Sequence, residues 1–400
     1  MITSTKNGRW GRHIVLNLAA GALWRIPGAF SVVRALGTHY SLRCVLFHNV
    51  SDTESPFTRG LNITTSESDF EAALRFLTAH YTPVRLDDVL ADPAAGTLPP
   101  RPVLVTFDDT YASVAEIAAP LCREYGVPAV FFVNADCLDN RQLALDNLIC
   151  YAVNTLGFDR VSAIARAATG MEDRGLNSMA AIFTRFLPAI SPRTREAFRD
   201  ALADSIQTSD RVLATGANLY LTRQQLHGLA AFDFEIGNHT YTHVHCRTLT
   251  PDALCLEIDR NKAELEAASG RTVRSFSVPY GSSADLTGDV LGHLRRSGHE
   301  AAFLSESVAN RRGSGPFRFD RVSSHADRDE AFFFEIEVMP RLRAMRNRFF
   351  GVKPAVAAVL HDGSRLGAEK GKLQETFNSD GPVRPQSARM TAGSRGGIEQ

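Results

Sequence analysis

Short apolar segments alternate with helical patterns along most of the chain, and this alternation most constrains its fold. The apolar segments are residues 44–47, 103–107, 129–133, 234–236, 275–278 and 301–303. Strands without a polar face are typical of parallel sheets that are buried on both sides. Helices then connect successive strands. The sequence therefore predicts an α/β fold with parallel strands.

A purely helical stretch interrupts this alternation between about residues 140 and 218. Helical periodicity predicts consecutive helices over 142–156, 161–168, 179–187 and 194–206. We expect a helical insertion between two strands of the sheet. A long helix is predicted over 327–349. Residues 362–400 contain few large apolar side chains, so we predict a disordered tail.

The amino-acid composition argues against a nucleic-acid partner and against a cysteine-rich scaffold. The 400 residues are 44% apolar, enough for a sizeable core, and 44 basic side chains balance 44 acidic ones. Proteins that bind nucleic acid through phosphate contacts usually carry a basic excess, so we expect no nucleic-acid partner. The six cysteines form no CxxC pair. We expect buried, reduced thiols rather than a disulfide framework or a cysteine zinc site.

The first 40 residues form a separate N-terminal segment. Lys6, Arg9 and Arg12 precede an apolar run over residues 14–24, which is too short to cross a bilayer. Three interpretations remain open: a helix packed on the domain, an amphipathic helix that contacts a membrane surface through residues 9–36, and a signal peptide. We expect a cytoplasmic protein, with the membrane face of that compartment and a secreted or periplasmic location as alternatives.

Two adjacent carboxylates, Asp108 and Asp109, follow directly after the apolar segment 103–107. Barrels built from parallel strands and helices place their catalytic groups at the carboxyl ends of the strands. Successive residues point in different directions, so we expect one carboxylate to bind a metal and the other to accept a proton. Asp is also common in turns, so the pair alone decides little. Phosphatases of the haloacid-dehalogenase type need Asp-x-Asp, which is absent at this position.

His239 and His243 form the second candidate group. They follow another short apolar segment, and their spacing puts both imidazoles on one face if the segment makes a helical turn. Imidazole with carboxylate suits Zn²⁺, Fe²⁺, Ni²⁺ or Co²⁺, and three protein ligands leave positions for water and substrate. We interpret His245 and Cys246 as neighbours, because a closed four-ligand site would be structural.

Together, Thr106-Phe-Asp-Asp109 and His239-Thr-Tyr-Thr-His243 resemble the first two motifs of the polysaccharide deacetylases of carbohydrate esterase family 4, which share the NodB homology domain. The resemblance covers roughly residues 42–348. It implies a NodB-type distorted (β/α) barrel of about seven parallel strands over residues 41–350. It also implies one divalent metal ion, with Zn²⁺ preferred over Co²⁺, Ni²⁺ or Fe²⁺, and an N-acetylated glycan as substrate.

The resemblance also implies roles for individual residues. Asp108 would be the general base, and Asp109, His239 and His243 would bind the metal. Residues 276–281 resemble the third motif, in which the backbone N–H of Tyr280 stabilises the oxyanion. A metal at such a site polarises the acetyl carbonyl and lowers the pKa of its water. The departing amine needs an acid to protonate it.

Two departures from the family pattern affect the surroundings of the base. Thr110 replaces the glycine that usually follows the aspartate pair. Ser277 replaces the arginine that often opens the third motif. The group that orients Asp108 must then come from elsewhere, and Arg321 is our candidate because related deacetylases carry an arginine near this point.

Two histidines compete for the role of the acid. Residues 45–50 resemble the N-terminal strand of the poly-N-acetylglucosamine deacetylase branch, in which the acid histidine comes early, and this favours His48. His361 fits the family's fifth motif superficially, at the edge of the predicted tail. We favour His48 because it follows a predicted strand, where barrel enzymes place their active-site residues.

The predicted function is hydrolysis of an N-acetyl amide on a sugar, in a polysaccharide, an oligosaccharide or a lipid-linked glycan, with release of acetate. One alternative keeps the site but changes the substrate to a non-sugar formyl or ureide amide, because fold and site do not fix the substrate. Another is a catalytically weak carbohydrate-binding protein. The intact set of Asp108, Asp109, His239 and His243 argues against this last alternative.

Overall fold

The computed structural model describes residues 25–26, 32, 42–91, 96–170, 176–310, 315–323 and 328–350. His361, the tail over 362–400 and nearly all of the N-terminal segment, including its proposed membrane contact, lie outside these residues. Backbone contacts divide the chain into Met1–Asp362 and Gly363–Gln400, and the fold below belongs to the first unit. Within the described ranges no helix is both long and apolar enough to cross a bilayer.

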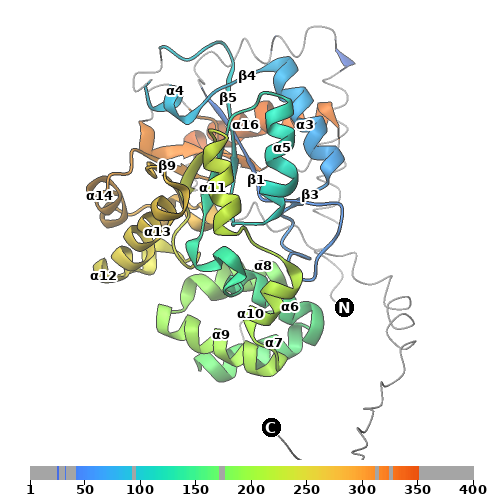
Figure 1. The fold of residues 1–400 in the computed structure, drawn as a ribbon, viewed down its shortest axis with the longest axis vertical. Helices are drawn as coiled ribbons and strands as arrows, with labels where there is room; N and C mark the ends of the chain where they lie inside the picture. Colours follow the sequence, from blue (N-terminus) through green and yellow to red (C-terminus); the bar gives the residue numbers. More distant parts are fainter. Residues whose placement is uncertain are drawn as a thin grey trace, which may run out of the picture. The chain divides into compact units, whose positions relative to one another are not determined.

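The centre of the fold is a parallel sheet (Figure 1). Each predicted apolar segment forms one of its strands, with ends that differ by at most two residues. Along the chain these strands are β1 (Arg43–Phe47), β5 (Pro102–Phe107), β6 (Ala129–Val133), β7 (Glu235–Asn238), β8 (Ser275–Ser277) and β9 (Ala301–Leu304). They pair in the order β9-β8-β7-β6-β5-β1, so the expected parallel α/β sheet is confirmed.

Two short strands bring the edges of the sheet together. β10 (Phe319–Asp320) pairs with β9, and β11 (Val322–Ser323) pairs with β1 at the opposite edge. The chain passes from one edge to the other at Arg321, which lies between these strands. The sheet is therefore a nearly closed barrel, as the family resemblance implies. Three further short strands are β2 (Asn49–Val50), β3 (Thr64–Thr65) and β4 (Thr82–Pro83).

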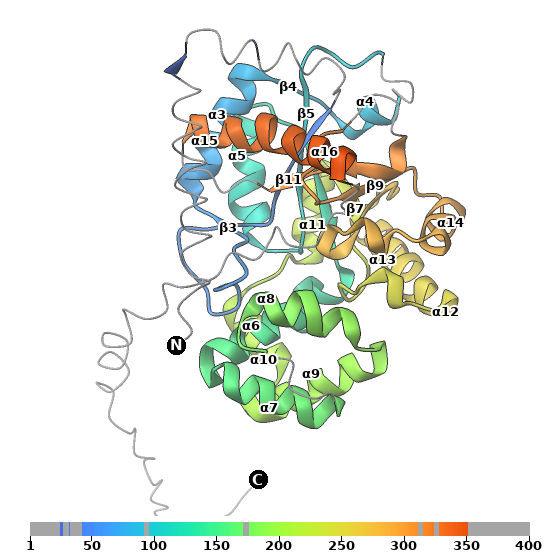
Figure 2. The same cartoon turned by 180° about the vertical axis from the view of Figure 1, so that it is seen from behind.

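Helices surround the barrel (Figures 1 and 2). Those that follow barrel strands are α3 (Glu67–His80), α4 (Leu86–Leu90), α5 (Ala119–Glu124), α11 (Arg223–Ala231), α12 (Pro251–Leu254), α13 (Arg260–Ser269), α14 (Gly288–Arg296), α15 (Asp329–Phe333) and α16 (Met339–Phe350). Residues 283–285 form a separate 3₁₀ turn that is capped by Ser282, and α14 begins after it at Gly288. Five of the six cysteines are buried and all are free; Cys255 is exposed.

The alternation of side chains along each strand explains why the apolar segments are continuous. Val105 and Phe107 point outward and belong to one core with the helices that cover the sheet. Leu104 and Phe132 belong to a different apolar cluster on the opposite face of the strands, inside the barrel. Both faces of each strand are thus buried, so polar and apolar residues do not alternate along the strands.

The predicted insertion is present between β6 and β7. Its helices are α6 (Leu145–Leu156), α7 (Phe158–Thr169), α8 (Met179–Ala181), α9 (Pro192–Ile206) and α10 (Asp210–Ala217), the last of which the sequence did not indicate. They form a group below the barrel in both views (Figures 1 and 2). This group has its own apolar core, which includes Leu148, Phe183 and Phe198 together with Leu61 from the loop before β3.

Candidate metal and catalytic site

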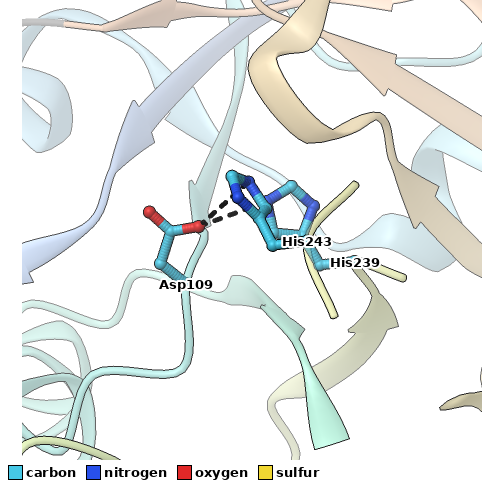
Figure 3. A group of neighbouring side chains, drawn as sticks. All are labelled: Asp109, His239 and His243. Carbon is cyan, nitrogen blue, oxygen red and sulfur yellow. Dashed lines mark ion pairs between the residues drawn. The ribbon is translucent and has the colours of Figure 1, made fainter. Parts of the chain in front are cut away.

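Three side chains that could hold a metal ion, Asp109, His239 and His243, converge at the carboxyl ends of β5 and β7 (Figure 3). Oδ1 of Asp109 lies 3.4 Å from Nε2 of His239 and 3.5 Å from Nε2 of His243. Within 4.8 Å of one another, these three atoms form a group that could hold one ion. Two nitrogens and one carboxylate oxygen match the ligand set of a catalytic zinc site with an open position. The residues therefore fit the predicted metal.

The two histidines do not share a helical turn, which was the condition under which their spacing would put both imidazoles on one face. Residues 239–245 form a loop in which Thr240 and His243 have positive φ angles of 62° and 55°. Two buried asparagines hold this loop. Asn134 donates to the carbonyl oxygen of Thr240 at 3.0 Å, and Asn238 accepts from the Thr240 amide at 3.0 Å. The loop conformation, rather than helical spacing, brings the imidazoles together.

Hydrogen bonds to the far nitrogen orient each imidazole. Nδ1 of His239 lies 2.9 Å from the carbonyl oxygen of Ser277, and Nδ1 of His243 lies 2.6 Å from Oδ2 of Asp146. Because both partners are acceptors, each Nδ1 must carry the proton. The lone pair of each Nε2 is then free to face Asp109, which is the arrangement that metal-binding histidines usually adopt.

Asp108 lies beside this group and is held by Arg321. Nη1 and Nη2 of Arg321 donate to the two carboxylate oxygens at 2.7 Å each, and the Ser277 hydroxyl donates to Oδ2 at 3.1 Å. Burial alone would raise the pKa of Asp108, but the charge of Arg321 and the nearby His239 lower it below its ordinary value. Asp108 is therefore ionised at neutral pH and can accept a proton.

His48 follows β1 and lines the same cavity as Asp108 and Asp109. Burial lowers the pKa of His48 below its ordinary value, although both aspartates act in the opposite direction. The structure thus brings His48 to the site, whereas His361 lies outside the described residues.

The cavity at this site combines barrel and insertion. It encloses about 990 Å³ of empty space, including its open mouth. Barrel loops contribute one part of the lining, and Asn147, Phe183 and Thr184 contribute another from the insertion. Leu61 and Ile63 form an apolar part of the wall. A cavity of this kind can receive a small group or one end of a larger molecule.

Tyr280 reaches the cavity through a strained turn after β8. Its φ angle is 59°, and a Cβ on the following Gly281 would lie 1.6 Å from the Ser305 hydroxyl, so this position requires glycine. The phenol hydroxyl of Tyr280 donates to Asp146 at 2.9 Å. Its ring stacks on His245 with centroids 4.0 Å apart. The side chain of Tyr280 is thus part of the site, in addition to the backbone N–H that the family motif emphasises.

Asp146 is a site residue that sequence reasoning missed. It lies in the first turn of α6, on the same side as Ile149 and Val153, which are buried. A carboxylate on the apolar stripe of a helix needs a buried partner, because an unpaired buried charge is costly. That mismatch was the signal in the sequence, but it does not identify His243 as the partner.

Comparisons with known proteins agree with this geometry. The profile of the polysaccharide deacetylase family matches residues 95–180 and 193–300, which contain both metal motifs. A comparison with curated proteins gives no match. Among solved structures, a Streptococcus pyogenes deacetylase, PplD in complex with acetate, is 14% identical with a TM-score of 0.50, and the match covers 75% of this chain and 100% of that one.

Two other solved structures give similar values. A polysaccharide deacetylase from Bacillus cereus is 15% identical, with 74% and 68% of the two chains covered and a TM-score of 0.48. IcaB from Ammonifex degensii is 19% identical, with 75% and 98% covered and a TM-score of 0.47. At such identities the likeness to PplD shows a shared fold. The family profile covers both motifs, the one with Asp109 and the one with His239 and His243, which meet at the carboxyl edge of the barrel. The chain therefore belongs to the polysaccharide deacetylase family of carbon–nitrogen hydrolases.

Proposed function

We propose that this protein is a metal-dependent N-deacetylase that removes acetyl groups from an N-acetylated glycan. The convergence of Asp109, His239 and His243 in the lining of one cavity, with the paired carboxylate of Asp108 beside them, is the observation that carries the proposal. Zn²⁺ is the preferred ion, because two imidazoles and one carboxylate leave an open position in its usual geometry.

Each residue has a distinct task in this proposal. The bound metal supplies Lewis-acid chemistry, which makes water more acidic and the acetyl carbonyl more electrophilic. Asp108, kept ionised by Arg321, accepts a proton from the attacking water. The backbone N–H of Tyr280 donates to the developing oxyanion. Protonated His48 delivers a proton to the departing amine, without which the carbon–nitrogen bond does not break readily. Because burial lowers the pKa of His48, it must take up this proton during the reaction.

The position of His48 also bears on the branch of the family. An acid that comes from the first strand, ahead of the metal motifs, is the arrangement that favours the poly-N-acetylglucosamine branch. We therefore propose N-acetylglucosamine residues as the first substrates to test.

Acetate release tests the proposal directly. Purified protein reconstituted with Zn²⁺ or Co²⁺ should liberate acetate from N-acetylglucosamine oligomers, and Asp108→Asn should abolish release while the metal stays bound. His48→Ala should lose activity, whereas His361→Ala should retain it; the reverse result would reassign the acid. Hydrolysis of formyl or ureide amides without acetate release would refute the sugar substrate. Failure to bind metal after reconstitution would refute metal dependence.

A further inference from the structure

We propose that the helical insertion is a working part of the metal site, because its Asp146 positions the ligand His243. This inference rests on the proposed metal at Asp109, His239 and His243. It concerns a residue that belongs to neither metal motif and lies about 100 positions away from the ligand in the chain. Asp146 is a positioning residue: it contacts the ligand rather than the reacting atoms.

Asp146 uses both of its oxygens at this site. Oδ2 lies 2.6 Å from Nδ1 of His243, and Oδ1 accepts the hydroxyl of Tyr280 at 2.9 Å. The side chain of Asp146 is 13% exposed, so water competes little for these bonds. One carboxylate from α6 thereby fixes a side chain of the loop after β7 and one of the loop after β8.

The contact with His243 has two consequences for a metal. Accepting the Nδ1 proton fixes the tautomer and leaves Nε2 facing Asp109. The negative charge of Asp146, 2.6 Å from Nδ1, also makes the imidazole a stronger electron donor to a cation. Removing outer partners of this kind typically weakens metal affinity about 10- to 100-fold.

A second side chain of the insertion holds the backbone of the same loop. Arg195 on α9 donates to the carbonyl oxygen of Thr242 at 3.1 Å and to that of His243 at 2.9 Å. It is buried, with 7% of its surface exposed. Two helices of the insertion therefore constrain the ligand, one through its imidazole and one through its carbonyl. The loop has positive φ angles at Thr240 and His243, a conformation that needs such support.

The test measures metal affinity rather than catalysis. Zn²⁺ is titrated into the full-length apoprotein against a competing chelator, and Co²⁺ absorption reports the geometry around the ion. Asp146→Ala should weaken Zn²⁺ binding by about 10- to 100-fold and alter the Co²⁺ spectrum. Asp146→Glu, which restores the charge, should recover part of the affinity. All variants carry Cys255→Ala, because Cys255, Asp259 and His293 form another potential metal group among the described residues.

The matched control is Asp210→Asn. Asp210 forms an ion pair with Arg199 within the insertion, and neither residue lines the cavity. This variant should loosen the insertion without changing Zn²⁺ affinity. Equal loss of affinity in both variants, or unchanged affinity in Asp146→Ala, would overturn the inference, as would wild-type protein that binds no Zn²⁺. Loss of affinity only in Asp146→Ala supports it even if wild-type protein releases no acetate from sugars, so the two proposals can fail separately.

Discussion

The pairing of Asp108 with Arg321 allows a quantitative test of how the site is built. Both side chains are buried, with 4% and 1% of their surfaces exposed, and two hydrogen bonds of 2.7 Å join them. Arg321→Met fills similar space but leaves the Asp108 carboxylate without its cation. Breaking a buried pair in this way typically costs about 3–5 kcal/mol. That is a large part of the roughly 5–15 kcal/mol by which proteins of this kind are stable.

Urea unfolding of metal-free protein at pH 7, followed by circular dichroism, measures this cost. Metal is removed because a bound ion would stabilise the folded state by mass action. The double variant Asp108→Asn/Arg321→Met should recover much of the loss, because no unpaired charge then remains buried. The coupling energy from the double-mutant cycle should be at least about 1.5 kcal/mol, within the range for contacting residues.

An exposed ion pair provides the control. Arg75 and Glu71 lie 3.4 Å apart on α3, and their side chains are 60% and 38% exposed. Arg75→Met should change the free energy of unfolding by less than about 0.5 kcal/mol. A similarly small effect for Arg321→Met, or a double variant no more stable than the single one, would refute the idea that Arg321 neutralises a buried base.

Two further variants test the structure around the site. Burial raises the pKa of Asp320 to about 7, so as pH rises the unfolded chain loses the Asp320 proton before the folded one does, and the free energy of unfolding should fall between about pH 4 and about pH 7. Asp320→Asn should make this dependence on pH weaker in urea unfolding. An unchanged dependence on pH would contradict the argument. Gly281→Ala should destabilise the fold more than Gly270→Ala in thermal unfolding, because both positions have positive φ but only Gly281 would place a Cβ 1.6 Å from the Ser305 hydroxyl. Equal effects would contradict the steric argument.

Much of the barrel could be predicted because its signals are local. Strands buried on both faces are continuously apolar, and parallel strands all end at one edge, so Asp109 and His239 were expected at the same edge of the sheet. The role of Arg321 beside Asp108 was predicted because Ser277 stands where the family pattern often has an arginine. The structure gives the physical reason: Arg321 lies where β10 and β11 bring the two edges of the sheet together, and its guanidinium enters the barrel above Phe132.

The conformation of residues 239–243 could not be predicted from the spacing of the two histidines. Histidines four residues apart suit a helix, but the segment instead adopts left-handed angles at Thr240 and His243. The cause lies elsewhere in the chain, in hydrogen bonds from Asn134 and Arg195 to this loop. Such contacts join residues that are 47 to 106 positions apart, and no local periodicity encodes them.

The place of the insertion between β6 and β7 explains how it comes to line the candidate site. β6 lies between β5 and β7, so the connection that follows β6 starts between the strand that carries Asp109 and the strand that leads to His239. A chain inserted there emerges beside both motifs. The 3₁₀ segment Ala135–Asn140 and the loop after it lead to Asp146, which lies in the first turn of α6 and contacts His243. Substitutions in this connection can therefore alter the orientation of His243 and the cavity wall together, without any change in the sequence of the barrel strands or in Asp109, His239 and His243.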